Sequence, residues 1–452
     1  MMSKGRHIKP ELLQAWTDGS TFTRLSFVIM GAGNLARKQI VKGLLFLSLE
    51  IGFFVFLAAR GINALAGLVT LGTKTQDFVY DPELGFSVSV PGDNSMIMLI
   101  YGICTVGIIL VFLLLWRLSV QSSYALDRSV KAGRRVPNFV EDVATLLDSR
   151  FHITLLSIPV LSIVVFTALP LVYMISIAFT NYDHNHLPPK NLFEWVGFET
   201  FRAMFTGNIA GTFFPLLGWT LVWAVFATFT CFFFGVLLAV FINARGVWGK
   251  KILRVLFVIT LAVPPFVSLL VMRNMLHASG PINAMLQSIG LIDQPIPFLT
   301  DGLMAKISVI VVNMWIGIPA TMLVATGILI TLPTDQLEAA RVDGATGLQL
   351  FRYITFPQIL TVMAPSLIQQ FIGNINNFNV IYLLTGGLPV NSNYYGAGET
   401  DLLVTWLYKL TVDNADYNLA SVVGIITFVL SAALSLLIYT RTNSYQEGGG
   451  KG

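Results

Sequence analysis

Long apolar runs alternate with polar connectors along the chain. Most runs reach the roughly 20 residues that a helix needs to cross a bilayer, and they lack the short alternation of membrane β-strands. We therefore predict an all-α integral membrane protein with about eight transmembrane helices. The predicted spans are 41–60, 96–117, 153–179, 215–242, 252–272, 307–331, 361–385 and 419–440.

The connectors differ in their content of Lys and Arg, which predicts their side of the membrane. The basic segments 1–40, 118–152 and 243–251 are expected in the cytoplasm. The outward loops would be 61–95, 180–214, 273–306 and 386–418, which are poor in basic residues for their length. An even number of spans then places the N- and C-termini in the cytoplasm of a multi-pass plasma-membrane protein. The first apolar run starts too far along the chain for a cleavable signal, so we expect it to be retained.

The linker at 118–152 is the predicted internal boundary, with two spans before it and six after it. The predicted organisation is a cytoplasmic segment (1–40), two N-terminal helices (41–117), a cytoplasmic linker (118–152), a six-helix core (153–440) and a flexible cytoplasmic tail (441–452).

Composition supports a lipid environment. Hydrophobic residues make up 55% of the 452 positions and charged residues 12%, against about 25% charged in a soluble domain. The net charge of +4 resides in the connectors, so nucleic acid is not an expected partner. Cys104 and Cys231 both lie in apolar runs, and we therefore expect neither a disulfide nor a metal or cofactor site.

The segment 333–357 has the pattern of two short helices joined by a tight turn at Gly344. Asp335 with Glu338 resembles a capping pair that would start the first helix. Thr346 with Gln349 would start the second. From these signals alone, a surface connector is as good an interpretation as a functional element.

Polar and helix-breaking residues interrupt three spans. The fifth holds Val263-Pro264-Pro265, which predicts a kink, and the sixth holds Asn313 and Trp315. Buried amides need partners, so they indicate either hydrogen bonds between helices or the wall of a polar cavity. The third is the seventh span, which carries Gln369, Gln370, Asn374, Asn376, Asn377 and Asn379.

The main acid within the predicted spans is Glu50, in the first of them, and such a scarcity of acids argues against a proton relay.

The 333–357 segment resembles the EAA motif of ABC importer permeases, through Glu-Ala-Ala, Asp-Gly-Ala and the residues Phe351, Ile354 and Pro357. The resemblance implies that the paired helices dock on an ATPase subunit. That ATPase would be a separate polypeptide, since a Walker A motif is absent from the sequence. The implied coupling residues are Glu338, Ala339, Ala340, Asp343, Gly344, Ala345, Phe351 and Pro357.

Residues from about 150 to 440 are similar to the larger permease subunit of maltose and maltodextrin importers, which also has two extra N-terminal helices. That family's sugar-contacting positions fall on Asn313, Gly317, Asn374 and Asn377, and Trp315 offers a flat surface for a sugar ring. In the fifth span, Leu261 and Pro265 depart from the family pattern. The short outer loop with Pro188 and Pro189 suits a Gram-positive cell. In the last outer loop, Tyr394, Tyr395 and Trp406 would either contact a binding protein or anchor the chain at the interface.

The resemblance implies a transport subunit rather than an enzyme. Its expected partners are a second homologous permease, an ATPase dimer, an extracellular sugar-binding protein, an oligosaccharide and membrane lipid. Maltose and maltodextrins are the expected substrates, and galacto-oligosaccharides are the alternative. A secondary transporter is disfavoured by the EAA-like loop. A membrane-embedded enzyme is disfavoured because only His184 and His186 of the five histidines form a pair.

Overall fold

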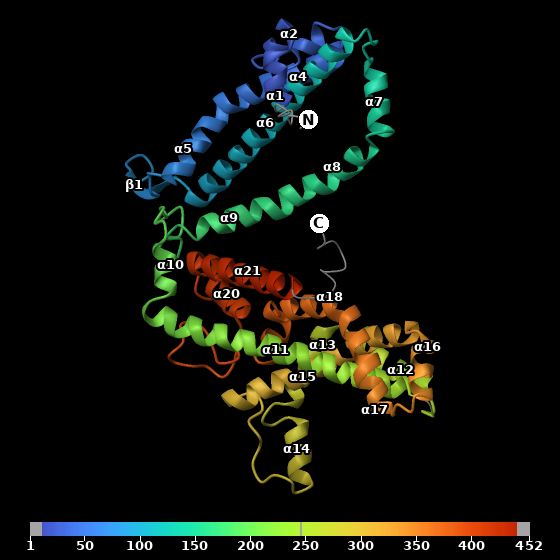
Figure 1. Cartoon of the computed structure of the whole chain (residues 1–452). Helices are drawn as coiled ribbons and strands as arrows, with labels where there is room; N and C mark the ends of the chain where they lie inside the picture. Colours follow the sequence, from blue (N-terminus) through green and yellow to red (C-terminus); the bar gives the residue numbers. More distant parts are fainter. Residues whose placement is uncertain (1–10, 245, 441–452) are drawn as a thin grey trace. The chain divides into compact units, whose positions relative to one another are not determined.

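The computed structural model describes residues 11–244 and 246–440, with the backbone alone for Thr334. Packing divides the chain into two compact units, Met1–Trp195 and Val196–Gly452, and each is described by itself. This division falls within the predicted outer loop 180–214, so the finer organisation into five segments stays a prediction. Both units are helical (Figure 1), which confirms the predicted fold class.

The first unit consists of α1 (Glu11–Thr17), α2 (Thr21–Leu25), α3 (Ala32–Leu35), α4 (Ile40–Phe56), the π-helical turn η1 (Leu57–Gly61), α5 (Ile62–Thr70), β1 (Asp77–Asp81), β2 (Phe86–Val90), α6 (Ser95–Lys131), α7 (Phe139–Leu147), α8 (Phe151–Ile163), the π-helical turn η2 (Val164–Ala168) and α9 (Leu169–Ile177).

The second unit consists of α10 (Glu199–Met204), α11 (Gly207–Asn243), α12 (Lys250–Ile259), the 3-10 turn η3 (Thr260–Ala262), α13 (Pro265–Met275), α14 (Pro281–Ser288), α15 (Gly302–Thr331), α16 (Thr334–Val342), α17 (Gly347–Leu350), the π-helical turn η4 (Phe351–Thr355), α18 (Phe356–Ile375), α19 (Phe378–Leu384), α20 (Leu403–Val412) and α21 (Tyr417–Thr440).

In the first unit, α4, η1 and α5 form one continuous rod that packs along α6. Phe53 stacks on Phe112 with ring centroids 3.8 Å apart. Further along, a Cβ on Gly67 would lie 3.4 Å from the side chain of Met98. Residue numbers rise along one helix as they fall along the other, so the two form an antiparallel hairpin.

The short helices α1 to α3 pack against the Lys131 end of α6. The Arg37 guanidinium forms a buried ion pair with Asp127 at 2.7 Å. The Gly31 N–H donates to Ser119 Oγ at 2.9 Å. The Met30 N–H donates to the Glu50 carboxylate at 2.8 Å. Glu50 is therefore a buried, hydrogen-bonded structural group of this unit.

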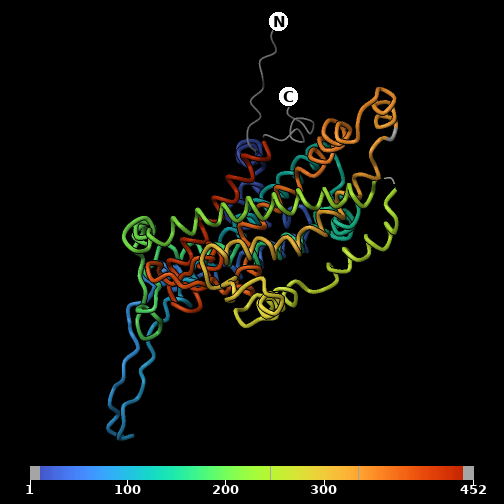
Figure 2. Tube along the Cα trace, turned by 90° about the horizontal axis from the view of Figure 1, so that it is seen from below, coloured from blue at the N-terminus to red at the C-terminus, as the bar shows by residue number. Residues whose placement is uncertain are grey.

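A β-hairpin, absent from the predictions, joins α5 to α6. Strands β1 and β2 pair antiparallel, with Asp77 opposite Val90 and Asp81 opposite Phe86. Figure 2 shows this blue hairpin extending away from the helices of its unit. Its large side chains are exposed, including Phe78 at 67% and Phe86 at 59%.

Helix α11 lies at the core of the second unit, where α15 and α18 pack along it. Glycines allow the close approach: a Cβ on Gly317 of α15 would overlap Sγ of Cys231, and one on Gly235 would lie 2.6 Å from Thr321 Cβ. One cluster of the core includes Trp223, Leu269, Val309 and Ile381.

In the described part of the chain, 6 helices are long and apolar enough to cross a membrane. A further pair, Lys250–Ala262 and Pro265–Met275, is bent by 93°, which confirms the kink predicted at the two prolines. Helix α18, in the predicted seventh span, is not among the six. Its amide side chains are consistent with this, because they make the helix less apolar. The total of about eight spans stays a prediction. The six helices are Ile40–Thr70, Ser95–Lys131, Phe151–Ile177, Gly207–Asn243, Gly302–Thr331 and Tyr417–Thr440.

Candidate functional site

The predicted turn between two short helices is present at Gly344. Helix α16 ends at Val342 and α17 begins at Gly347. Between them Gly344 has φ +84°, a left-handed conformation that suits glycine. The Ala345 N–H donates to Ala340 O at 2.9 Å, which closes the end of α16. The local sequence therefore fixes a sharp reversal at this position.

The two predicted capping pairs have different outcomes. Thr346 and Gln349 form a capping box: the Thr346 N–H donates to Gln349 Oε1 at 2.8 Å, and the Gln349 N–H donates to Thr346 Oγ1 at 3.4 Å. The prediction for Asp335 is wrong. Pro333 occupies the N-cap position of α16 and Asp335 lies within its first turn, where its charge favours the helix N-terminus.

The turn presents apolar side chains outward and is anchored at its base. Val342 is 88% exposed and Leu348 is 75% exposed. The Phe351 and Phe356 rings lie 5.7 Å apart at the start of α18. Large exposed apolar groups on a braced helical turn are typical of a docking surface. Of the predicted coupling residues, Glu338, Ala339, Asp343, Gly344 and Pro357 are exposed, and Ala340, Ala345 and Phe351 are partly buried.

The predicted seventh span is broken into α18 and α19. Helix α18 ends at Ile375 and α19 starts at Phe378. Asn377 caps α19, since the Val380 N–H donates to its Oδ1 at 3.3 Å. The amides that the sequence singled out thus coincide with a helix break.

Asn374, at the end of α18, is buried against α11. Its Nδ2 donates to Thr228 Oγ1 at 2.9 Å. Its backbone carbonyl accepts from Trp223 Nε1 at 3.0 Å. These two bonds fix the end of α18 on the middle of α11.

Asn313 and Gly317 of α15 face the same part of α11. Asn313 is buried, and its Nδ2 donates to Cys231 Sγ at 3.5 Å. Gly317 lies against the same sulfur. Asn313, Gly317 and Asn374 therefore gather along α11 between Trp223 and Cys231. Trp315 is 53% exposed on another side of α15.

Thr228 and Cys231 were missed as partners of the predicted residues. They lie on one face of α11, since they are three positions apart, and both are small polar groups in an apolar run. Charge is absent from this region: α11, α18 and residues 312–331 of α15 contain no Asp, Glu, Lys or Arg. The arrangement thus offers amide and hydroxyl groups without fixed charge.

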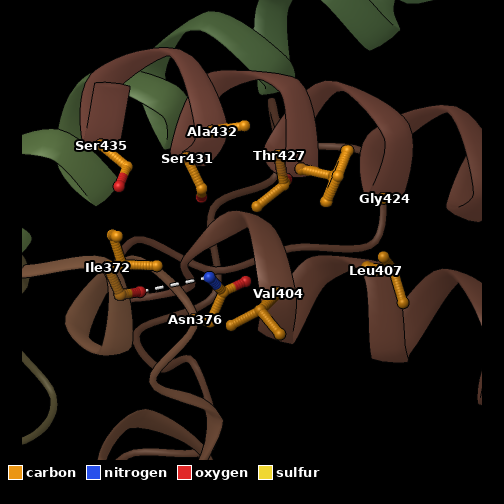
Figure 3. A pocket seen from close by; sticks show the side chains of 10 residues that line it. Ile372, Asn376, Val404, Leu407, Gly424, Thr427, Ser431, Ala432 and Ser435 are labelled. Carbon is orange, nitrogen blue, oxygen red and sulfur yellow. Dashed lines mark hydrogen bonds between the residues drawn. The ribbon is translucent and has the colours of Figure 1, made fainter. Parts of the chain in front are cut away.

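A pocket of about 350 Å³ lies between α18, α20 and α21 (Figure 3). Asn376, the residue that follows α18, lines the pocket, and its Nδ2 donates to Ile372 O at 3.2 Å. Thr427, Ser431 and Ser435 line it from α21. The hydroxyls of α21 were also missed, although their helical spacing marks one face of that span.

One predicted feature of the last outer loop differs. Trp406 is fully buried in α20, and its Nε1 donates to Tyr395 O at 2.7 Å, so it is a core residue rather than an anchor or a docking group. Leu261, one of the two positions that depart from the family pattern, lies at the break between α12 and α13 and is 41% exposed.

Comparison with known proteins identifies relatives along nearly the whole chain. Residues 231–444 match the family described as "Binding-protein-dependent transport system inner membrane component". The maltodextrin transport system permease protein MdxF of Bacillus subtilis is 35% identical over 92% of this chain and 94% of that protein. The galactooligosaccharides transport system permease protein GanP of the same organism is 34% identical, over 93% and 97%. The maltodextrin permease MalC of Streptococcus pneumoniae is 33% identical, over 92% and 95%.

A solved structure shares the fold. A bacterial ABC transporter involved in the import of the acidic polysaccharide alginate has a chain that is 24% identical, with a TM-score of 0.55. The match covers 66% of this chain and 96% of that one.

Proposed function

The chain belongs to the permease subunits of binding-protein-dependent ABC importers of oligosaccharides, and from this premise we propose that it carries maltose and maltodextrins into the cell. It is a membrane transport subunit, and its family works with a second permease, an ATPase and a substrate-binding protein. We further propose that ATP hydrolysis occurs on a separate ATPase dimer and that both termini lie in the cytoplasm.

The observation that carries the substrate proposal is the uncharged group of amides beside α11, contributed by α15, α18 and the start of α19. A neutral sugar needs hydrogen-bond donors and acceptors but no fixed charge, which is what Asn313, Asn374 and Asn377 offer near the break between α18 and α19. Broken helices are where transporters commonly place their substrates. In this proposal Gly317 lets α15 approach α11 closely beside the amides, and Trp315 stacks on a sugar ring at the protein surface.

The coupling role falls to α16 and α17. Exposed Val342 and Leu348 would enter a cleft on the ATPase, and the Phe351–Phe356 contact would transmit the movement to α18. Because α18 runs from Phe356 to Ile375 and carries Asn374 in its last turn, one rigid element would then link the ATPase to the sugar.

Galacto-oligosaccharides are the second candidate. GanP of B. subtilis, named for that substrate, matches this chain at 34% identity, against 35% for MdxF. Amides serve either sugar, so uptake measurements must separate the two.

The proposed role of Asn374 has a matched control in Thr228, its partner on α11. If Asn374 only holds α18 in place, Asn374→Ala and Thr228→Val should weaken transport equally, since each removes the same 2.9 Å hydrogen bond. If it also binds the sugar, Asn374→Ala should raise the KM for maltotriose at least about fivefold more, because one lost hydrogen bond to a neutral group is worth about 1 kcal/mol. Equal KM values for the two variants would refute sugar contact by Asn374.

A further inference from the structure

The first spanning helix continues to Thr70, beyond the predicted span 41–60, so that Arg60 lies within the helix and not at its end. The apolar stretch of the facing helix α6 gives the depth of this arginine. The α6 stretch 95–116 has no charged residue and is long enough to cross the hydrocarbon region. Thr105 lies at the middle of this stretch. A Cβ on Gly61 would be 3.5 Å from Thr105 Cγ2, so Arg60 stands next to the midpoint. The same hairpin places Glu50 far from this level, near the turn that holds Met30.

Arg60 is exposed on the surface of its unit. It belongs to the π-helical turn η1, and turns of this kind often mark functional positions in helices. No hydrogen bond or ion pair joins its guanidinium to the other described residues. A cation at this depth requires a partner.

The spanning helices of this chain do not supply that partner. Among their described residues only Glu50 and Asp127 are acidic. Glu50 accepts the Met30 N–H, and Asp127 pairs with Arg37 and Lys131. Headgroup phosphates lie about 15 Å from Arg60 along the helix axis, since half of a span of about 20 residues rises by 1.5 Å per residue. The counter-charge must come from a different polypeptide.

The surface beside Arg60 suits close contact with a helix. Asn63 lies three positions after Arg60, and Ala59 and Ala66 adjoin Asn63 at helical spacing. All three are exposed and small or polar, which is typical of helix contacts within membranes. Val69, 74% exposed, lies on the opposite side from Arg60 and has the bulk expected of a lipid-facing residue.

We propose that the face formed by Ala59, Arg60, Asn63 and Ala66 docks a transmembrane helix of another polypeptide, which places an aspartate or glutamate at the bilayer centre against Arg60. The guanidinium and the carboxylate satisfy each other in a low-dielectric region, and the small side chains let the two helices approach. The proposal concerns helix association and does not depend on which sugar is transported.

The test uses the full-length protein in phosphatidylcholine vesicles and a synthetic polyleucine helix with one central glutamate. Energy transfer between labels reports association, and an otherwise identical helix with a central glutamine is the reference. We expect the glutamate helix to associate at least about tenfold more tightly, since a charge-assisted hydrogen bond exceeds a neutral one by about that factor. Arg60→Leu should abolish the preference, and Arg117→Leu, at the end of the apolar stretch, should retain it.

Two further variants separate the contact face from general helix association. Ala59→Phe should weaken binding of the glutamate helix, and Val69→Phe should not. Equal association of the two peptides, or a preference that persists in Arg60→Leu, would overturn the proposal. Loss of the preference on adding phosphatidylglycerol would also overturn it, because a lipid phosphate would then be the partner of Arg60.

Discussion

Replacing Gly344 with aspartate should uncouple transport from ATP hydrolysis while leaving membrane insertion intact. Gly344 has φ +84°, and a Cβ there would meet nothing within 4 Å. The cost within this chain is therefore confined to the left-handed backbone, about 1–2 kcal/mol for a side-chain-bearing residue. That cost is small against a stability of about 5–15 kcal/mol, so the variant should fold.

Transport should nevertheless suffer, because the new carboxylate joins Asp343 and Glu338 on the exposed surface that we assign to ATPase docking. Uptake of labelled maltotriose should fall at least about tenfold, which corresponds to a loss of about 1.4 kcal/mol of docking free energy. The assay measures ATPase co-purification and uptake in proteoliposomes of matched protein content.

Gly347→Asp is the matched control for this experiment. Gly347 is also exposed with open space around it, but it lies outside the left-handed region and starts α17, where an acidic residue is favourable. It should retain most of the uptake. Normal uptake and normal ATPase co-purification by Gly344→Asp would refute the docking assignment.

Two predictions concern stability. Gly317→Leu should destabilise the protein by about 1–3 kcal/mol in thermal unfolding in detergent, because its Cβ would overlap Cys231 Sγ. Gly327→Leu, on the same helix but with open space around it, should not destabilise the protein. Equal melting temperatures of the two variants would show that α11 and α15 pack less tightly than described. The N–H groups of Thr73 and Lys74 donate to Asp93 at 2.7 and 2.9 Å and lower the pKa of its carboxyl. This stabilisation is present above the unfolded pKa of about 3.9 and is lost as pH falls through the lower folded pKa. The free energy of unfolding of Asp93→Asn should therefore be lower than that of the original chain at pH 7, and the two values should become equal in acid. A difference in unfolding free energy that does not change with pH would contradict this origin.

The sequence predicted those features that depend on local signals. Apolar runs located the long helices, and Gly344 with Thr346 and Gln349 predicted the α16–α17 turn because each acts within a few residues. The hairpin Asp77–Val90 also has a local signal, the alternation in Phe-Ser-Val-Ser-Val, but this segment is too short and too polar to stand out among the apolar runs.

Features that depend on contacts distant in sequence were not predictable in this way. Asn313 meets Cys231, and Asn374 meets Thr228, only because α15 and α18 both pack on α11. The burial of Trp406 depends on the fold of α20 within its unit, and an aromatic residue in a polar loop gives no sign of it. The position of Arg60 opposite the centre of α6 follows from the hairpin register, which the apolar runs alone leave open.

Uptake of labelled maltotriose and a labelled galacto-oligosaccharide, in cells with and without this gene, tests the central claim most directly. The account predicts that deletion abolishes maltotriose uptake, that the galacto-oligosaccharide is unaffected, and that the intact gene restores transport. Unchanged maltotriose uptake in the deletion strain, with the galacto-oligosaccharide lost instead, would contradict the assignment of maltodextrin as the substrate.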